Sequence, residues 1–318
     1  MRVGALELDG PFLQAPMARY TSRPARILAR RFGASLAFTE MLAAPAILEG
    51  KDRETGRPPL PEEHPIAAQI AAANAAAAAE CARRLAALGF DLVEINLACP
   101  APKIVRRGMG AALLRDPSAA ARVVEAVARA VTVPVTAKIR RGFSPESGDA
   151  SRELLRLLAE AGAAAATLHP RWAVQQFRGR ADRACLAEAA CASPLPLWGS
   201  GDLRTAADGV AALAECDVAA VTFARGAVGN PWIYAEANAL FEGRIFDPPA
   251  PDEVRKIVRE HVCLAQAHLR EGAARESTRR ALARYARRLP GGKRMLRALS
   301  GVRGGEAFWR FLAERGLV

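Results

Sequence analysis

Cys99 is the residue of this sequence whose type and position most clearly suggest chemistry. It follows an apolar run at 91–95 that predicts a buried strand, and it lies in a loop beside Pro100. The strand would carry the thiol to its exit, where a ligand can reach it. A thiol with an ordinary pKa of about 8.5 stays protonated at neutral pH and can deliver a proton to a carbon atom. The alternative is an inert small residue.

Basic residues and further cysteines accompany this candidate acid. Lys103 and Arg106 follow it in the same loop, where they would either lower the pKa of the thiol or bind phosphate groups of a substrate. The other cysteines lie in or beside helical patterns and form no CxxC pair, so we expect packing roles and a reduced, cytosolic state. They are Cys81, Cys185, Cys191, Cys216 and Cys263.

Short apolar or β-rich runs recur along the chain, and a helical pattern follows each of them. The runs lie at 12–15, 36–39, 66–69, 92–95, 133–138, 165–168, 195–198 and 218–223, and the clearest helical patterns lie at 75–88, 118–130, 151–161 and 205–215. Eight such βα units in about 240 residues match a closed (β/α)8 TIM barrel. An open doubly wound sheet is the rival fold. Its glycine-rich turn after the first strand is missing, because residues 15–18 read Ala-Pro-Met-Ala.

Polar residues follow the predicted strands, and in a barrel the carboxyl ends of all strands meet at one mouth. Glycine-containing turns at 199–202 and 224–226 would offer backbone N–H groups to a phosphate there. The set suits FMN. Gln69 would bind the amide edge of the ring, Lys138 would lie near N1 and O2, and Arg225 would pair with the phosphate. His169 would help to stabilise the negative charge that the ring gains near N1 and O2 on reduction, or contact the ribityl-phosphate chain. Each residue taken alone is also explained as a polar strand end.

The sequence changes character at the proline-rich run 248–251. Helical patterns follow at 252–269, at 276–289 and from 293 to about 299, so we predict a barrel domain at 1–243 and a small α-helical bundle at 244–318. Residues 241–318 contain 17 Lys and Arg against 9 Asp and Glu, a net charge of +8 out of +12 for the chain. Such a basic stripe predicts binding to an RNA backbone, with a solvated face as the alternative. Its members are Arg279, Arg280, Arg284, Arg287 and Arg288.

Composition limits the class of protein. With 51% hydrophobic and 25% charged residues the chain has an ordinary globular composition. No apolar run reaches about 18 residues and no signal peptide is apparent, so we expect a cytoplasmic, monomeric protein without a membrane span. His64, His261 and His268 have no partners at metal-ligand spacing, and we predict no metal site.

Three motifs in order resemble those of the tRNA-dihydrouridine synthases. The first is Asn-Leu-Ala-Cys-Pro at 96–100 with Lys103 and the glycines at 108 and 110. The second is Lys-Ile-Arg-Arg-Gly at 138–142, and the third is His-Pro-Arg at 169–171 with Gln175, Gly179 and Asp182. The similarity runs from residues 15–17 to 229–234 and extends more weakly into the basic helical part.

The resemblance implies a barrel that holds FMN and a helical domain that binds tRNA. NADPH or NADH would reduce the flavin, hydride would pass to C6 of a uridine in the D-loop, and Cys99 would protonate C5. Asn96 would orient the base or the flavin. The implied FMN contacts are Pro16, Met17, Ala18, Gln69, Asn96, Lys138, His169, Ser200, Gly201, Asp202, Ala224 and Arg225.

Several positions depart from the usual pattern of that family. Ala98 stands where glycine normally precedes Cys-Pro, so this loop has no glycine for a positive φ. Ser200 and Ala224 replace a common asparagine and a common glycine in the phosphate turns. Trp172 and Arg183 replace a common threonine and a common tryptophan.

Two other functions are consistent with parts of the sequence. A small-molecule FMN oxidoreductase of the dihydroorotate or dihydropyrimidine dehydrogenase type would share hydride transfer to a pyrimidine, but it would have no use for a basic helical tail. A non-enzymatic RNA-binding protein on a decayed barrel would not need the intact set of Gln69, Cys99, Lys138, His169 and Arg225.

Overall fold

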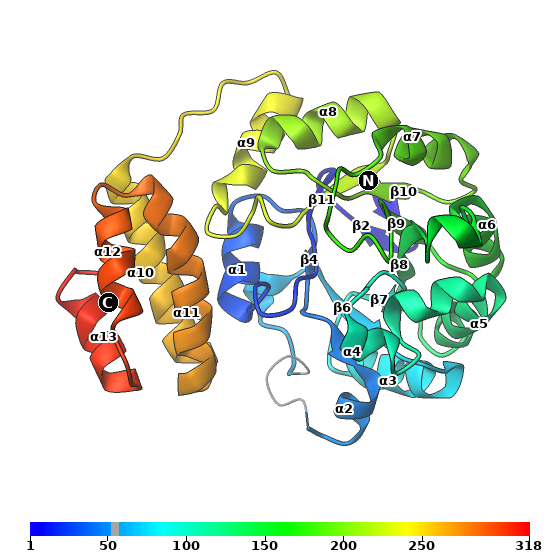
Figure 1. Cartoon of the computed structure of the whole chain (residues 1–318), viewed down its shortest axis with the longest axis horizontal. Coiled ribbons are helices and arrows are strands. Elements are labelled where there is room, and N and C mark those ends of the chain that lie inside the picture. The colour runs from blue at the N-terminus through cyan, green and yellow to red at the C-terminus, as the bar shows by residue number, and fades with distance from the viewer. Residues whose placement is uncertain (52–56) are drawn as a thin grey trace.

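The computed structural model describes residues 1–51 and 57–318, and its centre is a closed parallel barrel (Figure 1). The strands are hydrogen-bonded in the order β3-β11-β10-β9-β8-β7-β6-β4, and β5 pairs with β6. Between the end strands, Ser35 N donates to Phe12 O and Gln14 N donates to Leu36 O, each at 2.9 Å, which closes the sheet. The predicted (β/α)8 barrel is confirmed. Its strands are β3 (Phe12–Gln14), β4 (Ala37–Phe38), β5 (Leu42–Ala43), β6 (Ile66–Ala71), β7 (Leu92–Asn96), β8 (Val135–Gly142), β9 (Ala165–Trp172), β10 (Leu197–Gly199) and β11 (Ala220–Phe223).

Helices surround this barrel and pack on its outer face. They are α1 (Arg23–Arg31), α2 (Ala44–Leu48), α3 (Ala75–Ala87), α5 (Pro117–Ala128), α6 (Ser151–Glu160), α7 (Arg183–Ala192), α8 (Ala206–Cys216) and α9 (Trp232–Phe241). The four helices expected from periodicity are confirmed to within two residues at each end. The short helix α4 (Pro102–Val105) and the 3₁₀ turns η1 (Pro61–Glu63), η2 (Gly110–Arg115) and η3 (Pro145–Ser147) lie in the connecting loops.

Side chains in the connecting loops start several of these helices. Asn74 accepts a hydrogen bond from Ala77 N, and Asp116 accepts one from Ala119 N. Asp182 does the same for Cys185 N at the start of α7. Each bond satisfies one of the N–H groups that the first helical turn leaves without a partner, a contribution of about 1 kcal/mol. These local signals set where the outer helices begin and therefore how long the loops at the barrel mouth are.

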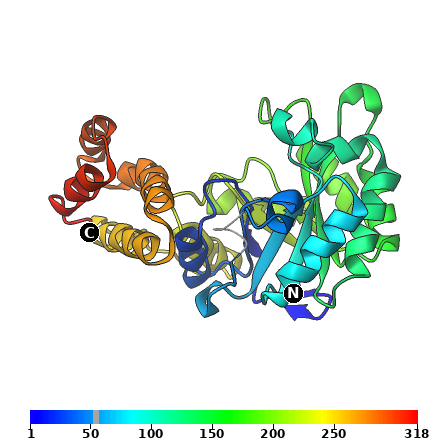
Figure 2. The same ribbon diagram turned by 90° about the horizontal axis from the view of Figure 1, so that it is seen from below.

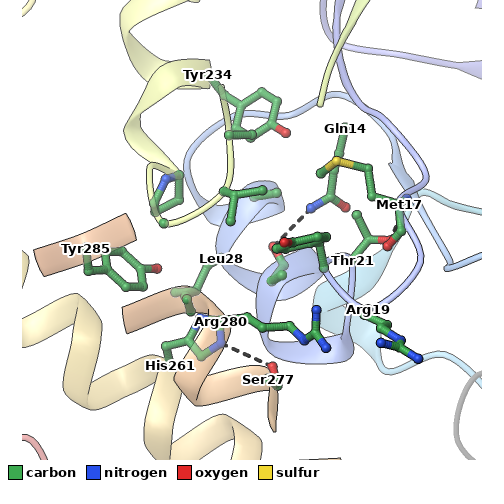
Figure 3. Close-up of a pocket in the computed structure, with 18 residues that line it drawn as sticks. Gln14, Met17, Arg19, Thr21, Leu28, Tyr234, His261, Ser277, Arg280 and Tyr285 are labelled. Carbon is green, nitrogen blue, oxygen red and sulfur yellow. Dashed lines mark hydrogen bonds between the residues drawn. The ribbon is translucent and has the colours of Figure 1, made fainter. Parts of the chain in front are cut away.

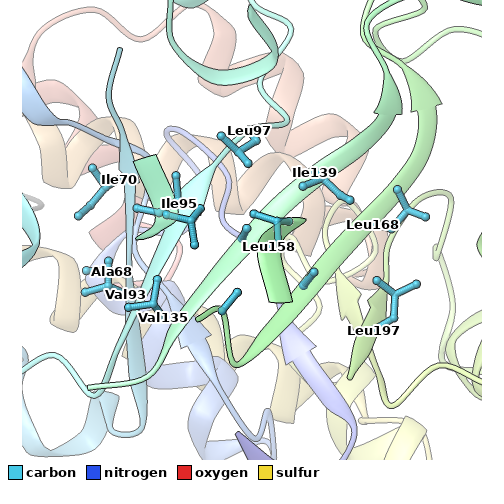
Figure 4. Close-up of a cluster of buried hydrophobic side chains, with 14 of the residues drawn as sticks. Ala68, Ile70, Val93, Ile95, Leu97, Val135, Ile139, Leu158, Leu168 and Leu197 are labelled. Carbon is cyan, nitrogen blue, oxygen red and sulfur yellow. The ribbon is translucent and has the colours of Figure 1, made fainter. Parts of the chain in front are cut away.

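The main hydrophobic core lies between the strands and the outer helices. Outward-facing residues such as Val93, Ile95 and Val135 alternate along their strands and pack against helix residues such as Leu158 of α6 (Figure 4). Each fully buried aliphatic side chain of this kind contributes roughly 1.5–3 kcal/mol. This layer holds the barrel rigid, so that the inward-facing side chains have fixed positions.

The inside of the barrel is apolar at one end and polar at the other. At the amino-terminal end a separate cluster that includes Leu13, Phe38 and Trp198 fills the interior. The hairpin of β1 (Arg2–Val3) and β2 (Leu6–Glu7) adds Val3 and Leu8 to that cluster. Toward the carboxyl ends of the strands the inward-facing residues become polar. The interior is thus filled at the amino-terminal end of the barrel, and its polar side chains face the opposite mouth.

A bundle of four further helices lies beside the barrel, against α1 and α9 (Figures 1 and 2). They are α10 (Pro251–His268), α11 (Glu271–Tyr285), α12 (Gly292–Ser300) and α13 (Gly305–Ala313), with a 3₁₀ turn η4 (Ala286–Arg288) after α11. Their shared core includes Leu28 of α1 and Trp232 of α9. The boundary predicted at 243/244 falls in the segment between α9 and α10, and we retain it as a proposal.

The predicted helix at 276–289 is wrong at both ends. Helix α11 begins at Glu271 and ends at Tyr285, and residues 286–288 form a 3₁₀ turn. The change of pitch means that Arg287 and Arg288 do not continue the α-helical face that carries Arg280 and Arg284. The basic stripe is therefore not one straight line of charge.

Candidate active site

A cavity of about 480 Å³ opens at the carboxyl ends of the barrel strands. Strand ends that are far apart in the sequence meet there because the barrel closes. Cys99 lines this cavity, and so does every residue that the sequence predicts to bind a cofactor. Those residues are Pro16, Met17, Ala18, Gln69, Asn96, Lys138, His169, Ser200, Gly201, Asp202, Ala224 and Arg225.

Asn96, the last residue of β7, holds the loop that carries Cys99. Its Oδ1 accepts hydrogen bonds from Ala98 N at 3.1 Å and from Cys99 N at 2.8 Å. Ala98 has no positive φ, so alanine fits this position without backbone strain. Gly110 packs behind the loop with φ +60°, and a Cβ there would lie 2.8 Å from Cys99 O. The loop is therefore fixed from both sides.

The environment of Cys99 keeps its thiol protonated. Burial raises the pKa of the thiol, while a backbone hydrogen bond with Ala101 and the charge of Arg140 lower it by less. Lys103 and Arg106 lie exposed at α4. The expectation that these two cations lower the thiol pKa is therefore wrong, because Arg140 is the cation that acts on the thiol and burial outweighs it. Their other expected role, binding substrate phosphates, stays a prediction.

A chain of hydrogen-bonded polar side chains runs from beneath the cavity to its wall, which Gln69 and Asn96 line. Glu94 is fully buried, and its Oε2 accepts from Gln69 Nε2 at 2.6 Å while its Oε1 accepts from Thr167 Oγ1 at 3.2 Å. Gln69 Oε1 in turn accepts from Asn96 Nδ2 at 2.8 Å. Glu94 and Asn96 are two residues apart on β7, so both point into the barrel. The chain connects the barrel interior to the Cys99 loop.

Lys138 and His169 present buried nitrogen atoms without partners to the same cavity. Neither Lys138 Nζ nor His169 Nδ1 has a hydrogen-bond partner among the described residues. Burial lowers the pKa of Lys138 to about 8, although the charge of Glu94 raises it. Burial, followed by the charges of Arg140 and Lys138, lowers the pKa of His169 well below its usual range. The histidine is therefore neutral at pH 7. Its Nε2 lies 3.5 Å from Arg171 Nη1, so His169 Nδ1 and Lys138 Nζ are the two nitrogens available to a polar ligand.

Asp202 connects two arginines at the turn after β10. It accepts from Arg171 Nη2 at 2.5 Å, from Ala181 N at 2.8 Å and from Arg225 Nη2 at 3.0 Å. Burial raises the pKa of Asp202, but these hydrogen bonds and the charges of the two arginines lower it by more. The net shift is therefore downward. Arg225 already has a carboxylate partner and is less available to a phosphate than the sequence suggests.

The turn at 199–202, which the sequence predicts to bind a phosphate, has one backbone amide already engaged. Ser200 N donates to Leu168 O at 3.0 Å, so this amide belongs to the sheet. Gly201 has φ +108°, and a Cβ there would lie 2.9 Å from Ala181 Cβ and 3.5 Å from His169 Cε1. Glycine therefore suits this position, because the positive φ and the close packing against Ala181 both disfavour a side chain. The substitutions at Ser200 and Ala224 keep both residues on the cavity wall.

The remaining departures, Trp172 and Arg183, have structural contacts. The Arg141 guanidinium lies over the Trp172 ring at 4.9 Å from its centroid, and a Cβ at Gly142 would lie 2.6 Å from that ring. Arg183 pairs with Glu215 at 2.5 Å on the outer surface. Arg183 does not line the cavity.

Sequence reasoning missed several residues of the site. Arg140 lines the cavity, and it donates to Ala98 O at 2.8 Å and to Gln176 O at 2.8 Å. Glu94 lies beneath it within an apolar run. Alternation along a strand could have predicted both, because residues two apart point to the same face. Glu94 lies two residues before Asn96, and Arg140 lies two residues after Lys138. Other missed cavity residues are Tyr20, Met41, Phe177, Leu203 and Arg204.

The predicted RNA-binding arginines have different surroundings. Arg279 donates to Leu299 O at 3.2 Å and to Val302 O at 3.3 Å, so it holds the helical bundle together. Arg288 donates to Asn230 Oδ1 at 2.8 Å across to the barrel. Arg284 packs at Gly229, where a Cβ would lie 2.5 Å from Arg284 Cβ. Arg287 is exposed. RNA binding by these residues stays a prediction.

A small second cavity, about 30 Å³, lies between the barrel and the helical bundle (Figure 3). Arg280 lies in its wall, pairs with Glu276 and stacks over Tyr20 at 5.6 Å from the ring centroid. His261 Nε2 lies 3.4 Å from Ser277 Oγ, and burial lowers the pKa of His261 to about 4. Tyr20 lines both cavities. The bundle therefore contacts the rim of the main cavity directly.

Two negative findings apply to the described residues. Within 1–51 and 57–318, no three His, Cys, Asp or Glu side chains come together as metal ligands. In the same ranges, no helix is both long enough and apolar enough to cross a membrane.

Comparison of structures shows the fold. An old yellow enzyme homologue from Zymomonas mobilis aligns with a TM-score of 0.59 at 16% identity, covering 79% of this chain and 94% of that one. A histamine dehydrogenase from Rhizobium sp. 4-9 aligns with a TM-score of 0.56 at 15% identity, covering 83% of this chain and 50% of that one.

Comparison of sequences shows the family. A probable tRNA-dihydrouridine synthase of Rhodobacter capsulatus is 37% identical, with 81% of this chain and 80% of that protein covered. The tRNA-dihydrouridine synthase B of Xanthomonas campestris pv. campestris is 34% identical, with 82% and 79% covered. A probable tRNA-dihydrouridine synthase of Treponema pallidum is 35% identical, with 90% and 87% covered. The family model described as dihydrouridine synthase (Dus) matches residues 13–310, and the chain therefore belongs to the dihydrouridine synthase family.

Proposed function

We propose that this chain is a tRNA-dihydrouridine synthase that uses FMN, with NADPH or NADH as the reductant, to reduce the C5–C6 double bond of a uridine in the D-loop of tRNA. The observation that carries the proposal is the composition of one cavity. A protonated thiol at Cys99 faces the same space as the unpartnered nitrogens of Lys138 and His169. Family membership supports the same reaction.

The residues of the cavity fit a flavin. A buried ammonium without a partner is costly, so Lys138 Nζ calls for an anionic or strongly accepting group. The absence of a side chain at Gly201 leaves room for close backbone approach beside His169. Gln69 has one amide hydrogen and one lone pair beyond its bonds to Glu94 and Asn96. We propose that Lys138, His169 and Gln69 hold the flavin ring and that Arg225, Gly201 and Ser200 lie near its phosphate.

Cys99 supplies the proton in the proposed reaction. The reduced flavin, when bound, would supply hydride to C6 of the uracil. The Sγ–H bond of Cys99 then breaks, its proton goes to C5, and a thiolate remains on the enzyme. The guanidinium of Arg140 favours that thiolate, since its charge lowers the thiol pKa. Solvent returns the proton before the next turnover. Neutral His169 does not compete as an acid, because its pKa lies well below its usual range.

The helical bundle gives this barrel access to a polymer. Its basic residues adjoin the rim of the cavity through Arg280 and Tyr20. Lys103 and Arg106 stand exposed at α4, in the loop that follows Cys99. We propose that these surfaces bind the tRNA backbone and that the protein acts as a cytoplasmic monomer. A small-molecule pyrimidine reductase would have no need of the bundle.

The test is dihydrouridine formation on unmodified tRNA. Purified protein with FMN and NADPH should convert uridine in tRNA from cells that lack the gene, and mass spectrometry of nuclease fragments should place the product in the D-loop. Cys99→Ala serves as the matched control, which should bind FMN and oxidise NADPH without forming product. A protein that cannot bind FMN, or a Cys99→Ala variant with full product formation, would refute the proposal.

A further inference from the structure

Glu94 is a fully buried carboxylate that the proposed reaction leaves unused. It lies on the inner face of β7, beneath the cavity, in register with Gln69 of β6. Its partners are Gln69 Nε2 at 2.6 Å and Thr167 Oγ1 at 3.2 Å. Burying a carboxylate is costly even with such partners. A residue of this kind in a core needs a reason, and the direction of its hydrogen bonds supplies one.

The hydrogen bonds that connect Glu94 to the Cys99 loop all have the same direction: each group donates toward Glu94 and accepts from the side of the loop. Glu94 Oε2 accepts from Gln69 Nε2, so Gln69 turns Oε1 toward Asn96. Burial raises the pKa of Glu94, while the charge of Lys138 and the bonds from Gln69 and Thr167 lower it by less. A proton on Oε1 would be donated to Thr167 Oγ1 and would leave this order unchanged. Asn96 must then turn Nδ2 toward Gln69 and Oδ1 toward the loop. That Oδ1 accepts from Ala98 N and Cys99 N. Had either amide the opposite orientation, a donor would face a donor or an acceptor would face an acceptor.

We propose that Glu94 is a positioning residue, which sets the order of donors and acceptors along Gln69 and Asn96 and thereby holds the Cys99 loop in place. The role rests on the proposed function of Cys99 as the acid. Glu94 touches neither the thiol nor the cavity wall, so it reaches the Cys99 loop only through the two amides. Its charge acts separately on Lys138, whose pKa it raises. The N–H groups of Ala98 and Cys99 require Asn96 Oδ1 to face the loop, so they impose the same order from the other end of the chain of amides.

Asn96→Asp tests this order. The new carboxylate still accepts from the loop, but it places an acceptor against Gln69 Oε1 while Glu94 still demands Gln69 Nε2. One of these contacts must break. Glu94→Gln alone leaves the native order intact, because the new amide accepts from Gln69 through its oxygen and donates to Thr167 Oγ1. Together, the two substitutions allow Gln69 to turn over and satisfy every group.

The primary readout is the alkylation rate of Cys99 in the flavin-loaded full chain without RNA. It is followed by mass spectrometry on the tryptic peptide 85–103, whose single cysteine is Cys99. Rates measured across a series of pH values separate access to the thiol from a change in its pKa. Dihydrouridine turnover is the second readout. Because alkylation needs no substrate, the loop result stands even if the proposed reaction fails.

We expect Asn96→Asp to raise the alkylation rate about tenfold, Glu94→Gln to change it less than about twofold, and the double variant to return it to within about threefold of the unsubstituted protein. Turnover is measured at saturating FMN, because loss of the Glu94 charge also acts on Lys138, and it should fall and recover in the same pattern. Two controls accompany them. Thr167→Val combined with Asn96→Asp leaves Glu94 as an acceptor and should not rescue. Glu94→Met combined with Asn96→Asp removes the same charge without offering a donor and should rescue less.

Three results would overturn the inference. Unchanged alkylation in Asn96→Asp would mean that the chain does not hold the loop. A double variant as reactive as Asn96→Asp would mean that Glu94 does not set the order. Equal rescue by Glu94→Met would mean that repulsion between two carboxylates, rather than hydrogen-bond direction, explains the effect.

Discussion

Lys138→Met should make the protein more stable while it weakens flavin binding. The ammonium of Lys138 is buried without a hydrogen-bond partner among the described residues. Burial is the main cause that lowers its pKa from 10.5 to about 8, which corresponds to a cost of about 3 kcal/mol for folding around the charge. Methionine has a similar shape without the charge. Since Glu94 loses a neighbouring cation, we expect a net gain of about 1–3 kcal/mol in the free energy of unfolding.

The sign of the pH dependence follows from where each state releases the proton. The folded protein loses it near 8 and the unfolded chain near 10.5, so the unfolded chain binds more protons between these values. The free energy of unfolding of the native sequence therefore rises with pH across that window. The advantage of Lys138→Met is largest below 8 and shrinks as the pH approaches 10.5.

Urea unfolding of the flavin-free protein, followed by circular dichroism at about pH 7 and about pH 9, measures both effects. Lys103→Met is the matched control, because Lys103 is exposed and its loss should change stability by less than about 0.5 kcal/mol. Fluorescence titration with FMN should show about ten- to a hundredfold weaker binding by Lys138→Met. A variant less stable than the native protein at neutral pH, or a gain that does not shrink at high pH, would refute the reasoning.

Three further predictions concern the acid, the scaffold and the RNA surface. Cys99→Ser should reduce dihydrouridine formation by about 10²–10⁴-fold while stopped-flow measurements show unchanged flavin reduction. Because burial raises the pKa of the Cys99 thiol above its ordinary value, the thiol should stay protonated through neutral pH. A fall in native activity at neutral pH that follows loss of this proton would contradict the assignment. Glu63 is fully buried and pairs with Arg23 at 2.9 Å and with Arg26 at 2.6 Å. Glu63→Gln should therefore lower the free energy of unfolding, measured in urea, by about 3–5 kcal/mol. A decrease of less than about 1 kcal/mol would show that these ion pairs are not needed for stability. Arg287→Ala should reduce the salt dependence of tRNA binding by about one counterion without changing stability, and an unchanged slope in filter binding would remove Arg287 from the interface.

The barrel and the residues of its mouth were open to prediction because they depend on local pattern. Apolar runs of strand length at regular intervals predict a βα repeat. A parallel barrel places the carboxyl ends of all its strands at one mouth. The order of strands in the closed sheet therefore follows from the order of runs along the chain. Cys99, Lys138 and His169 could be placed together for this reason alone.

Other features required the spatial arrangement. The hairpin of β1 and β2 is too short to show a period, and α7 is rich in alanine, which blurs its apolar face. The last turn of α11 packs closely against the barrel at Gly229, a contact that the sequence pattern does not show. Arg279 looked like a surface cation, but it donates to carbonyl groups 20 and 23 residues away. Such partners cannot be read from spacing.

The sequence by itself determined the repeat of eight strands and helices, the placement of Cys99 and its companions at strand ends, and the basic helical tail. Tertiary structure decided how those groups are charged and oriented. Burial raised the thiol pKa of Cys99, although cations stand next to it in the sequence, and Asp202 engaged Arg225. Glu94 acquired its place in a directed chain of amides only when β6 and β7 came into register. The physical reason is that a pKa and a hydrogen bond depend on distance and solvent exposure, which closure of the barrel sets.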